Sequence, residues 1–117
     1  MVLVSSANAL VGRATMPIYD AAKAGVLSLT RSLAVDLAGD RIRVNSICPG
    51  FTVTDFHVRR AAAQGRTAED LRAAQPGLLK RPAEPEEMAA AIAFLASDDA
   101  SYITATNLMV DAGGHAV

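Results

Sequence analysis

Cysteine is nearly absent from this sequence, and so is any excess of charge of one sign. The 117 residues include one cysteine, Cys48, so no disulfide can form within the chain, which is typical of a reducing compartment. The 12 acidic and 11 basic residues give a formal net charge of −1, with an isoelectric point near 6.0. This balance offers no basic surface for a phosphate backbone and argues against a nucleic-acid partner.

Long apolar runs and clustered metal-binding residues are missing as well. No apolar run approaches the roughly 18 to 20 residues that a transmembrane helix needs. The first residues, MVLVSS, have no basic flank, so we expect no signal peptide, no membrane partner and a cytoplasmic protein. The two histidines, His57 and His115, have no clustered cysteines or carboxylates beside them, so their spacing predicts no metal site.

The sequence does contain an alternation of strand and helix patterns. Short apolar or alternating runs predict three strands, at residues 2–5, 42–48 and 106–111. Helical periodicity and helix-start signals predict helices at residues 17–38 and 84–97, and one or two short mobile helices between them, for instance around 55–63 and 67–74. Strands that alternate with long helices favour parallel pairing, and therefore an α/β fold in one small domain.

Three polar side chains near the start of the longest helix suggest acid–base chemistry. Tyr19 and Lys23 are four residues apart, which puts both on one helix face. A nearby ammonium favours the phenolate form of a tyrosine, which can then exchange a proton with a substrate oxygen. Ser6 follows the first strand, at the sheet edge where ligands bind, and its hydroxyl can stabilise a developing oxyanion. Taken singly, each residue also fits an ordinary surface or backbone-capping role.

Further motifs follow in a fixed order: R-V-N at 43–45, P-G-x-x-x-T at 49–54, P-E-E at 85–87, F-L-A-S-D at 94–98 and V-D-A-G-G at 110–114. With the strand-end serine and the Y-x-x-x-K, they make the whole chain resemble the second half of the short-chain dehydrogenase/reductase family. The resemblance implies the C-terminal part of a Rossmann-like, doubly wound parallel sheet, as a single partial domain over residues 1–117.

The resemblance also implies an NAD(P)-dependent oxidoreductase that transfers a hydride between the nicotinamide and a secondary alcohol or ketone. Oxoacyl reductases and sugar- or steroid-type dehydrogenases share these motifs. Tyr19 would be the proton donor or acceptor, Lys23 would hold the nicotinamide ribose, and Ser6 would polarise the substrate oxygen. Four more residues would form the wall against the nicotinamide, with the Thr54 hydroxyl near its amide or the phosphates: Pro49, Gly50, Thr52 and Thr54.

Several features of the family are not found in these residues. No G-x-G-x-x-G turn is present to seat a pyrophosphate, and the residue that selects NAD or NADP is absent, so we expect both upstream of Met1. A second hypothesis therefore stays open, in which the chain is a catalytically inactive truncated fragment or an interaction module of the same family. Ala105 and Ala112 stand where the family usually has glycine, which brings the local geometry of the tail into question.

Association with another chain is the last expectation that the resemblance implies, since family members commonly use the helix at 17–38 in dimer contacts. The helix has a main apolar stripe: Ala22, Val26, Leu29, Leu33 and Leu37. A neighbouring face is also too apolar for bulk water: Leu27, Thr30 and Ala34. We expect a partner chain to cover part of this second face, and the complete protein to be a homo-oligomer.

The remaining polar residues have simpler interpretations. Cys48 is expected to be a small buried hydrophobe, and His57 a solvated loop histidine with a specificity role as the alternative. A hydrolase built on Ser6, a histidine and Asp111 would need a G-x-S-x-G turn, which is absent, and would leave Tyr19 without a role.

Overall fold

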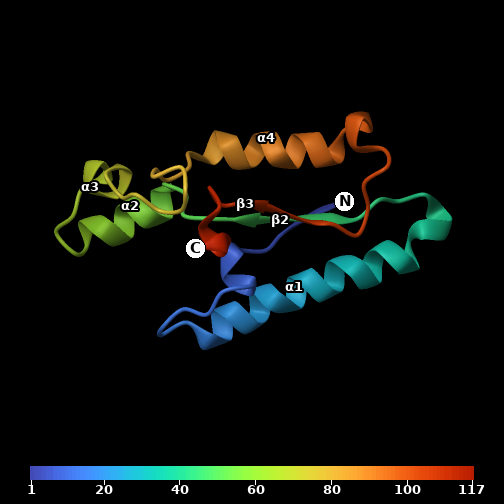
Figure 1. Ribbon diagram of the computed structural model, residues 1–117, viewed down its shortest axis with the longest axis horizontal. Helices are drawn as coiled ribbons and strands as arrows, with labels where there is room; N and C mark the ends of the chain where they lie inside the picture. The colour runs from blue at the N-terminus through green and yellow to red at the C-terminus, as the bar shows by residue number, and fades with distance from the viewer.

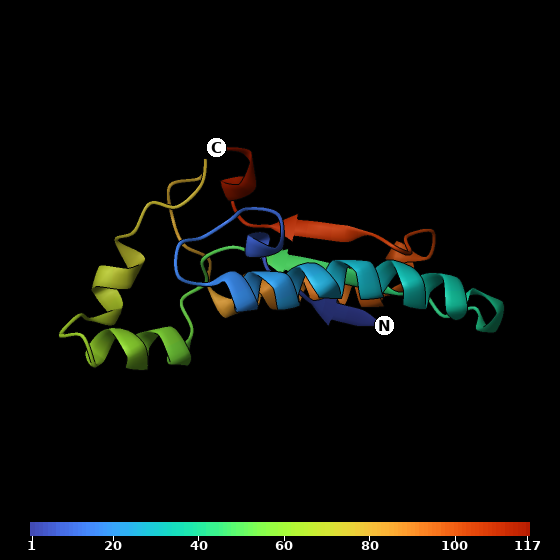
Figure 2. The same cartoon turned by 90° about the horizontal axis from the view of Figure 1, so that it is seen from below.

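A computed structural model describes all residues, 1–117, and contains one parallel sheet between two helical layers (Figure 1). The sheet has three strands in the order β1-β2-β3: β1 is Val2–Val4, β2 is Asn45–Pro49 and β3 is Asn107–Val110. Helix α1 (Pro17–Asp36) covers one face, and α4 (Pro85–Ala96) covers the other (Figures 1 and 2). The predicted α/β fold with three parallel strands is confirmed.

Two shorter helices, α2 (Asp55–Ala62) and α3 (Ala68–Arg72), extend beyond the sheet at one end of the molecule (Figure 1). They pack around a small apolar cluster of Val53, Ala61 and Leu71. Four short 3₁₀ turns complete the structure: η1 (Ala7–Ala9), η2 (Ala38–Asp40), η3 (Asp98–Ala100) and η4 (Gly114–Ala116).

The predicted strands and helices are all present, including both short middle helices, with ends that differ by at most three residues from the predicted ones. Pro17 and Pro85 each occupy the first turn of a helix, where the missing N–H costs nothing. The second strand begins at Asn45 instead of residue 42 because Asn45 lies opposite Val2, the first residue of β1, so residues 42–44 have no strand to pair with.

The two crossovers in the sheet have opposite hands, which the sequence pattern does not predict. Each new strand adds on the same side of the previous one, yet α1 and α4 lie on opposite faces. The path β1-α1-β2 is right-handed, so the path β2-α4-β3 is left-handed (Figure 2). About 98% of parallel crossovers are right-handed, so this second connection is an uncommon feature of the fold.

The R-V-N motif joins β2 to the end of α4. The Arg43 guanidinium donates to the carbonyl oxygens of Leu95 and Ser97, at 2.9 Å each, and to that of Ile103 at 3.0 Å. These carbonyls lie at and after the C-terminus of α4, where a cation is favourable. The side-chain amide of Asn45 also donates to the Ile103 carbonyl, at 2.9 Å, so the motif fixes the turn that leads into β3.

The predicted orientation of α1 is wrong in part. Leu27, Thr30 and Ala34, which we expected a partner chain to cover, are buried within the chain itself, because α1 lies against β2 and η1 through this face. The Thr30 hydroxyl is satisfied by donating to the Val26 carbonyl at 2.7 Å. Leu29, a member of the predicted inner stripe, is instead about half exposed.

Much apolar surface remains uncovered. The accessible surface is 7294 Å², whereas a compact folded protein of 12.2 kDa exposes about 6,100 Å². On α1, Ile18 is 85% exposed and Val35 is 76% exposed. The outer edge of β1 has no hydrogen-bonded neighbour in the sheet. A free edge and exposed apolar side chains are features of a surface that another chain can cover.

Candidate active site

The predicted site residues meet at the carboxyl-terminal edge of the sheet, where β1, β2 and the start of α1 converge. One cavity of about 320 Å³ is lined by all seven of them: Ser6, Tyr19, Lys23, Pro49, Gly50, Thr52 and Thr54. Residues that are up to 48 positions apart in the chain therefore share one space. This is the edge at which open α/β sheets bind ligands.

Ser6 is positioned to donate a hydrogen bond into this cavity. It is buried and caps η1, where its Oγ accepts from the backbone N–H of Asn8 at 3.1 Å. The hydroxyl proton of Ser6 has no acceptor within the chain, so it is free for a bound oxygen.

Lys23 lies between the Tyr19 ring and the end of β1. Its Nζ donates to the Val4 carbonyl at 3.1 Å and lies 5.7 Å from the centre of the Tyr19 ring. The Ser5 hydroxyl donates to the Lys23 carbonyl at 2.7 Å, which ties the same turn of α1 to the strand. The ammonium therefore has a fixed position beside an accessible phenol, as the four-residue spacing predicts.

Gly50 is explained by the close approach of β3. A Cβ at this position would lie 2.6 Å from the Cα of Asp111, which is closer than carbon atoms can pack. Any other residue would therefore displace the backbone at Gly50 or at Asp111. The Thr52 hydroxyl donates to the Gly50 carbonyl at 3.2 Å. The cavity wall at the end of β2 is therefore built from backbone held at short range.

His57 belongs to the cavity wall, and the interpretation as a solvated loop residue is wrong. Thr54 caps α2, so that His57 falls in the first turn of a helix instead of a loop. Its Nδ1 lies 2.9 Å from the Thr54 Oγ1, and its half-buried ring contacts the rings of Phe51 and Phe56 edge-on. The Thr54 hydroxyl is thus already engaged within the chain, as is that of Thr52.

A second cavity, of about 250 Å³, adjoins the first. The two cavities share five residues: Ser6, Tyr19, Pro49, Gly50 and His57. We call the first cavity, which contains Lys23, Thr52 and Thr54, the lysine lobe. The second cavity, which contains Arg13 and part of the loop before α1, is the arginine lobe. Ser6 and Tyr19 therefore stand where the two lobes meet.

The whole chain is similar in sequence to known proteins. A family model described as enoyl-(acyl carrier protein) reductase matches residues 1–115. A cis-4-hydroxycyclohexanecarboxylate dehydrogenase from Sinomonas cyclohexanicum is 48% identical over all of this chain. The chain belongs to the short-chain dehydrogenase/reductase family.

Other members of the family agree with this assignment. An L-rhamnose 1-dehydrogenase (NAD(P)(+)) from Azotobacter vinelandii is 40% identical and matches 97% of this chain. The solved structure of Thermoplasma acidophilum aldohexose dehydrogenase has a TM-score of 0.89, 32% identity and 99% coverage of this chain. This chain spans 45%, 43% and 48% of the Sinomonas, Azotobacter and Thermoplasma proteins, so it is about half as long as these relatives.

Asp111, from the V-D-A-G-G motif of this short-chain dehydrogenase/reductase, holds the C-terminal tail. Its carboxylate accepts from the Gly113 N–H at 3.1 Å and from the His115 N–H at 2.8 Å, and contacts the His115 Nδ1 at 2.8 Å. Burial favours a raised pKa for Asp111, but these hydrogen bonds outweigh it and lower the pKa below its ordinary value. Ser6 is hydrogen-bonded to neither histidine, so the residues do not form a hydrolase triad.

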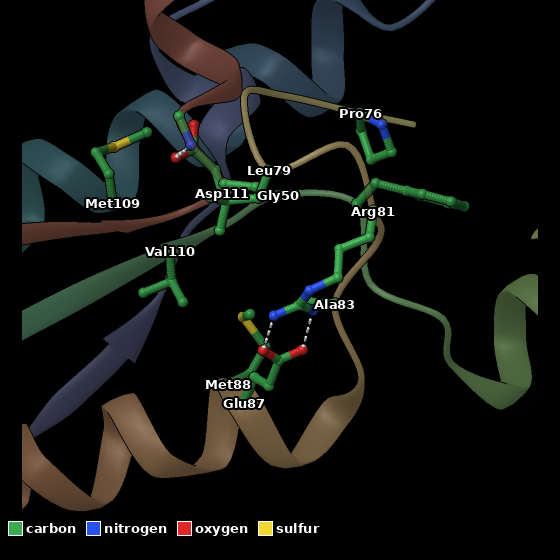
Figure 3. Close-up of a pocket in the computed structure, with 13 residues that line it drawn as sticks. Gly50, Pro76, Leu79, Arg81, Ala83, Glu87, Met88, Met109, Val110 and Asp111 are labelled. Carbon is green, nitrogen blue, oxygen red and sulfur yellow. Dashed lines mark hydrogen bonds and ion pairs between the residues drawn. The ribbon is translucent and has the colours of Figure 1, made fainter. Parts of the chain in front are cut away.

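A third cavity, of about 220 Å³, lies between the end of β3, α4 and the segment before α4 (Figure 3). The Arg81 guanidinium makes two hydrogen bonds to the Glu87 carboxylate there, at 2.8 and 2.7 Å (Figure 3). This ion pair and the backbone N–H of Glu84 lower the pKa of Glu87 to about 2. The pair fastens the chain before α4 to the helix itself.

The remaining single-residue expectations concern Cys48, Ala105 and Ala112. Cys48 is fully buried, as predicted, and burial raises the pKa of its thiol. Ala105 and Ala112 have left-handed backbones, with φ of 60° and 56°, which is the conformation that glycine adopts most readily. No three histidine, cysteine or acidic side chains are grouped to hold a metal ion, and no helix is long and apolar enough to cross a membrane.

Proposed function

We propose that residues 1–117 form the catalytic half of an NAD(P)-dependent oxidoreductase that interconverts a secondary alcohol and a ketone. The observation that carries the proposal is that Ser6 and Tyr19 line both lobes of the cavity. A hydroxyl donor and a phenol at the junction can act on one oxygen atom, while the lobes receive a cofactor on one side and a substrate on the other.

Each catalytic side chain has a distinct task in this proposal. Ser6 donates a hydrogen bond from its free hydroxyl to the substrate oxygen and so stabilises negative charge on it. Tyr19 gives a proton to that oxygen when a ketone is reduced, and accepts it back when an alcohol is oxidised. Lys23 uses one of its three N–H donors on Val4 and keeps two for the phenol oxygen and for hydroxyl groups in the lysine lobe.

The lysine lobe fits the nicotinamide end of a dinucleotide. When bound, the cofactor supplies or accepts the hydride. Tyr19 and Lys23 would hold its ribose, and the wall from Pro49 to Thr54 would lie against the ring. The free N–H groups of Lys23 are the observation that favours this fit. The Thr54 hydroxyl would have to leave His57 to reach the amide, so we assign that contact to backbone.

The nature of the relatives supports the reaction class. The Sinomonas protein is named for a hydroxyl group on a ring that also carries a carboxylate, and the Azotobacter protein is named for both NAD and NADP. We therefore propose a small hydroxylated or keto compound as the substrate and leave both cofactors as candidates.

A chimera tests the proposal, because the relatives are about twice as long as this chain. Residues 1–117 replace the matching 45% of the Sinomonas dehydrogenase, which supplies the rest of a complete enzyme. We expect the chimera to reduce NAD or NADP with a secondary alcohol. A folded chimera that binds the cofactor and shows no turnover with any secondary alcohol would refute the proposal.

A second candidate function is favoured by the short length relative to the relatives and by the free edge of β1. In it, residues 1–117 on their own are catalytically inactive and act through association with another chain. Turnover in the chimera separates the two: a catalytic half should become active there, and an association module should not.

A further inference from the structure

Arg13 is the positively charged side chain of the arginine lobe that has no partner. Its guanidinium makes no hydrogen bond or ion pair within the chain, although the lobe also contains the catalytic Ser6 and Tyr19. The loop that carries it is anchored, because the backbone N–H of Arg13 donates to the Asp20 carboxylate at 3.2 Å. The base of this cation is therefore fixed beside the reaction centre.

Two carboxylates lie near Arg13, and one of them lines the lobe. Asp111 lines it, but its carboxylate is taken by His115 and by the backbone N–H of Gly113. Asp20 does not line the lobe; its Oδ2 accepts from the Arg13 backbone N–H, and its buried Oδ1 has no hydrogen-bond partner within the chain. His57 contributes a ring whose Nε2 has no partner within the chain. The lobe thus presents a free guanidinium and an imidazole, and the one carboxylate that lines it, Asp111, is already paired.

The remaining walls are largely apolar. Val11, Met16 and Phe51 line the lobe together with Arg13. A ligand here would have its reacting oxygen near Ser6 and Tyr19, an apolar body against these side chains, and its third contact at Arg13.

We propose that the arginine lobe selects a substrate that carries an anionic group, such as a carboxylate, apart from its reacting hydroxyl or ketone, and that Arg13 recognises this anion. The inference rests on the proposed function for the position of the reacting oxygen. A guanidinium offers a planar pair of N–H donors that matches a carboxylate, and such charge-assisted bonds are about twice as strong as neutral ones.

Binding without turnover is the first test. Ligand-observed NMR, which tolerates association of the protein, measures the affinity of the 117-residue chain for benzoate and for its neutral analogue benzamide. We expect benzoate to bind roughly tenfold more tightly, and Arg13→Gln to abolish that preference. Arg31→Gln, a change at an exposed arginine of α1 outside both lobes, should preserve it. Equal affinities for the two ligands, or a preference that survives in Arg13→Gln, would overturn the proposal.

Turnover by the chimera is the second test. Arg13→Gln should raise KM for a hydroxy acid roughly tenfold with little change in kcat, and leave KM for cyclohexanol unchanged, because the anion contact is the same in ground and transition states. Arg13→Lys keeps the charge but lacks the planar pair of donors, so its KM for the hydroxy acid should lie between those of the parent chimera and Arg13→Gln. An equal loss on both substrates would contradict a role in anion recognition. An inactive chimera would count against the proposed function alone, since the NMR comparison needs no catalysis.

Discussion

Replacing Tyr19 by phenylalanine is the sharpest test of the active site. The change removes one hydroxyl from a side chain that is 41% exposed and whose oxygen has no hydrogen bond within the chain. Its effect on folding should therefore stay within about 0.5 kcal/mol. Lys23 keeps its hydrogen bond to Val4, so the shape of the lysine lobe should persist.

The loss should fall on the chemical step. General acid–base catalysis contributes roughly 100- to 10,000-fold, so kcat of the Tyr19→Phe chimera should drop by about that factor, which corresponds to about 2.7 to 5.4 kcal/mol in the barrier. Cofactor affinity should fall much less than kcat, because Lys23 keeps its contact with the ribose when the Tyr19 hydroxyl is lost.

The chain provides a matched control in Tyr102, its only other tyrosine, which is fully exposed and lies outside all three cavities. Single-turnover formation of NADH or NADPH, followed by absorbance, measures the step directly. Tyr102→Phe should behave like the parent chimera. If Tyr19→Phe turned over within about threefold of the parent, the phenol would not be the acid–base group, and the reasoning from the lobe junction would fail.

Four further predictions concern stability, cofactor binding and association. The pKa of Glu87 is about 2 in the folded chain and 4.5 as its ordinary value, so its ion pair stabilises the fold fully above pH 4.5, and this stabilisation is lost as the pH falls through 2. In the chimera, the urea midpoint of Glu87→Gln should therefore lie below that of the parent at pH 7 and converge with it near pH 2. The control variant Glu86→Gln should have the urea midpoint of the parent throughout. Ala105→Gly and Ala112→Gly should each stabilise the fold by about 0.5 to 1 kcal/mol. A left-handed alanine costs about 1 to 2 kcal/mol, and the greater backbone entropy of glycine in the unfolded chain offsets part of the relief. A loss of stability in urea titrations would contradict this prediction. Residues 1–117 alone should bind NADH and NADPH very weakly, and a micromolar Kd by fluorescence would disprove it. The same chain should associate, and a monodisperse monomer in sedimentation velocity with cooperative unfolding would count against an exposed edge at β1.

Local patterns predict most of the fold because they depend on neighbouring residues. The β-branched run before Ser5 forms a strand, and prolines at 17 and 85 start helices, because these preferences act within a few residues. The same is true of the Tyr19 and Lys23 pair, whose spacing of four residues determines its geometry once a helix forms.

Features that depend on packing cannot be predicted from the local sequence pattern. Either apolar face of α1 could have faced the sheet by periodicity alone, and the structure selects Leu27 and Ala34. The left-handed second crossover and the contact of Arg13 with Asp20 likewise depend on where the loops run. The prediction of a solvated loop residue at His57 is wrong because its contacts with Thr54 and Phe51 depend on how α2 packs, although the helix expected around residues 55–63 already includes it.

The proposed catalytic residues lie within a single strand–helix unit, and this arrangement bears on the choice between the two candidate functions. Lys23 bonds to the end of β1 through its side chain, and its carbonyl accepts from Ser5, so β1 and α1 fix one another. Ser6 is held by η1, which directly follows the strand. Of these contacts, only the one from Lys23 lies at the free edge of β1, because the Val4 carbonyl points away from β2; Ser5 and Ser6 are held without that edge. Loss of activity in residues 1–117 alone would therefore reflect weak cofactor binding and not a displaced Tyr19. Supplying the remaining part of a relative, as in the chimera, should restore turnover without any change to these side chains.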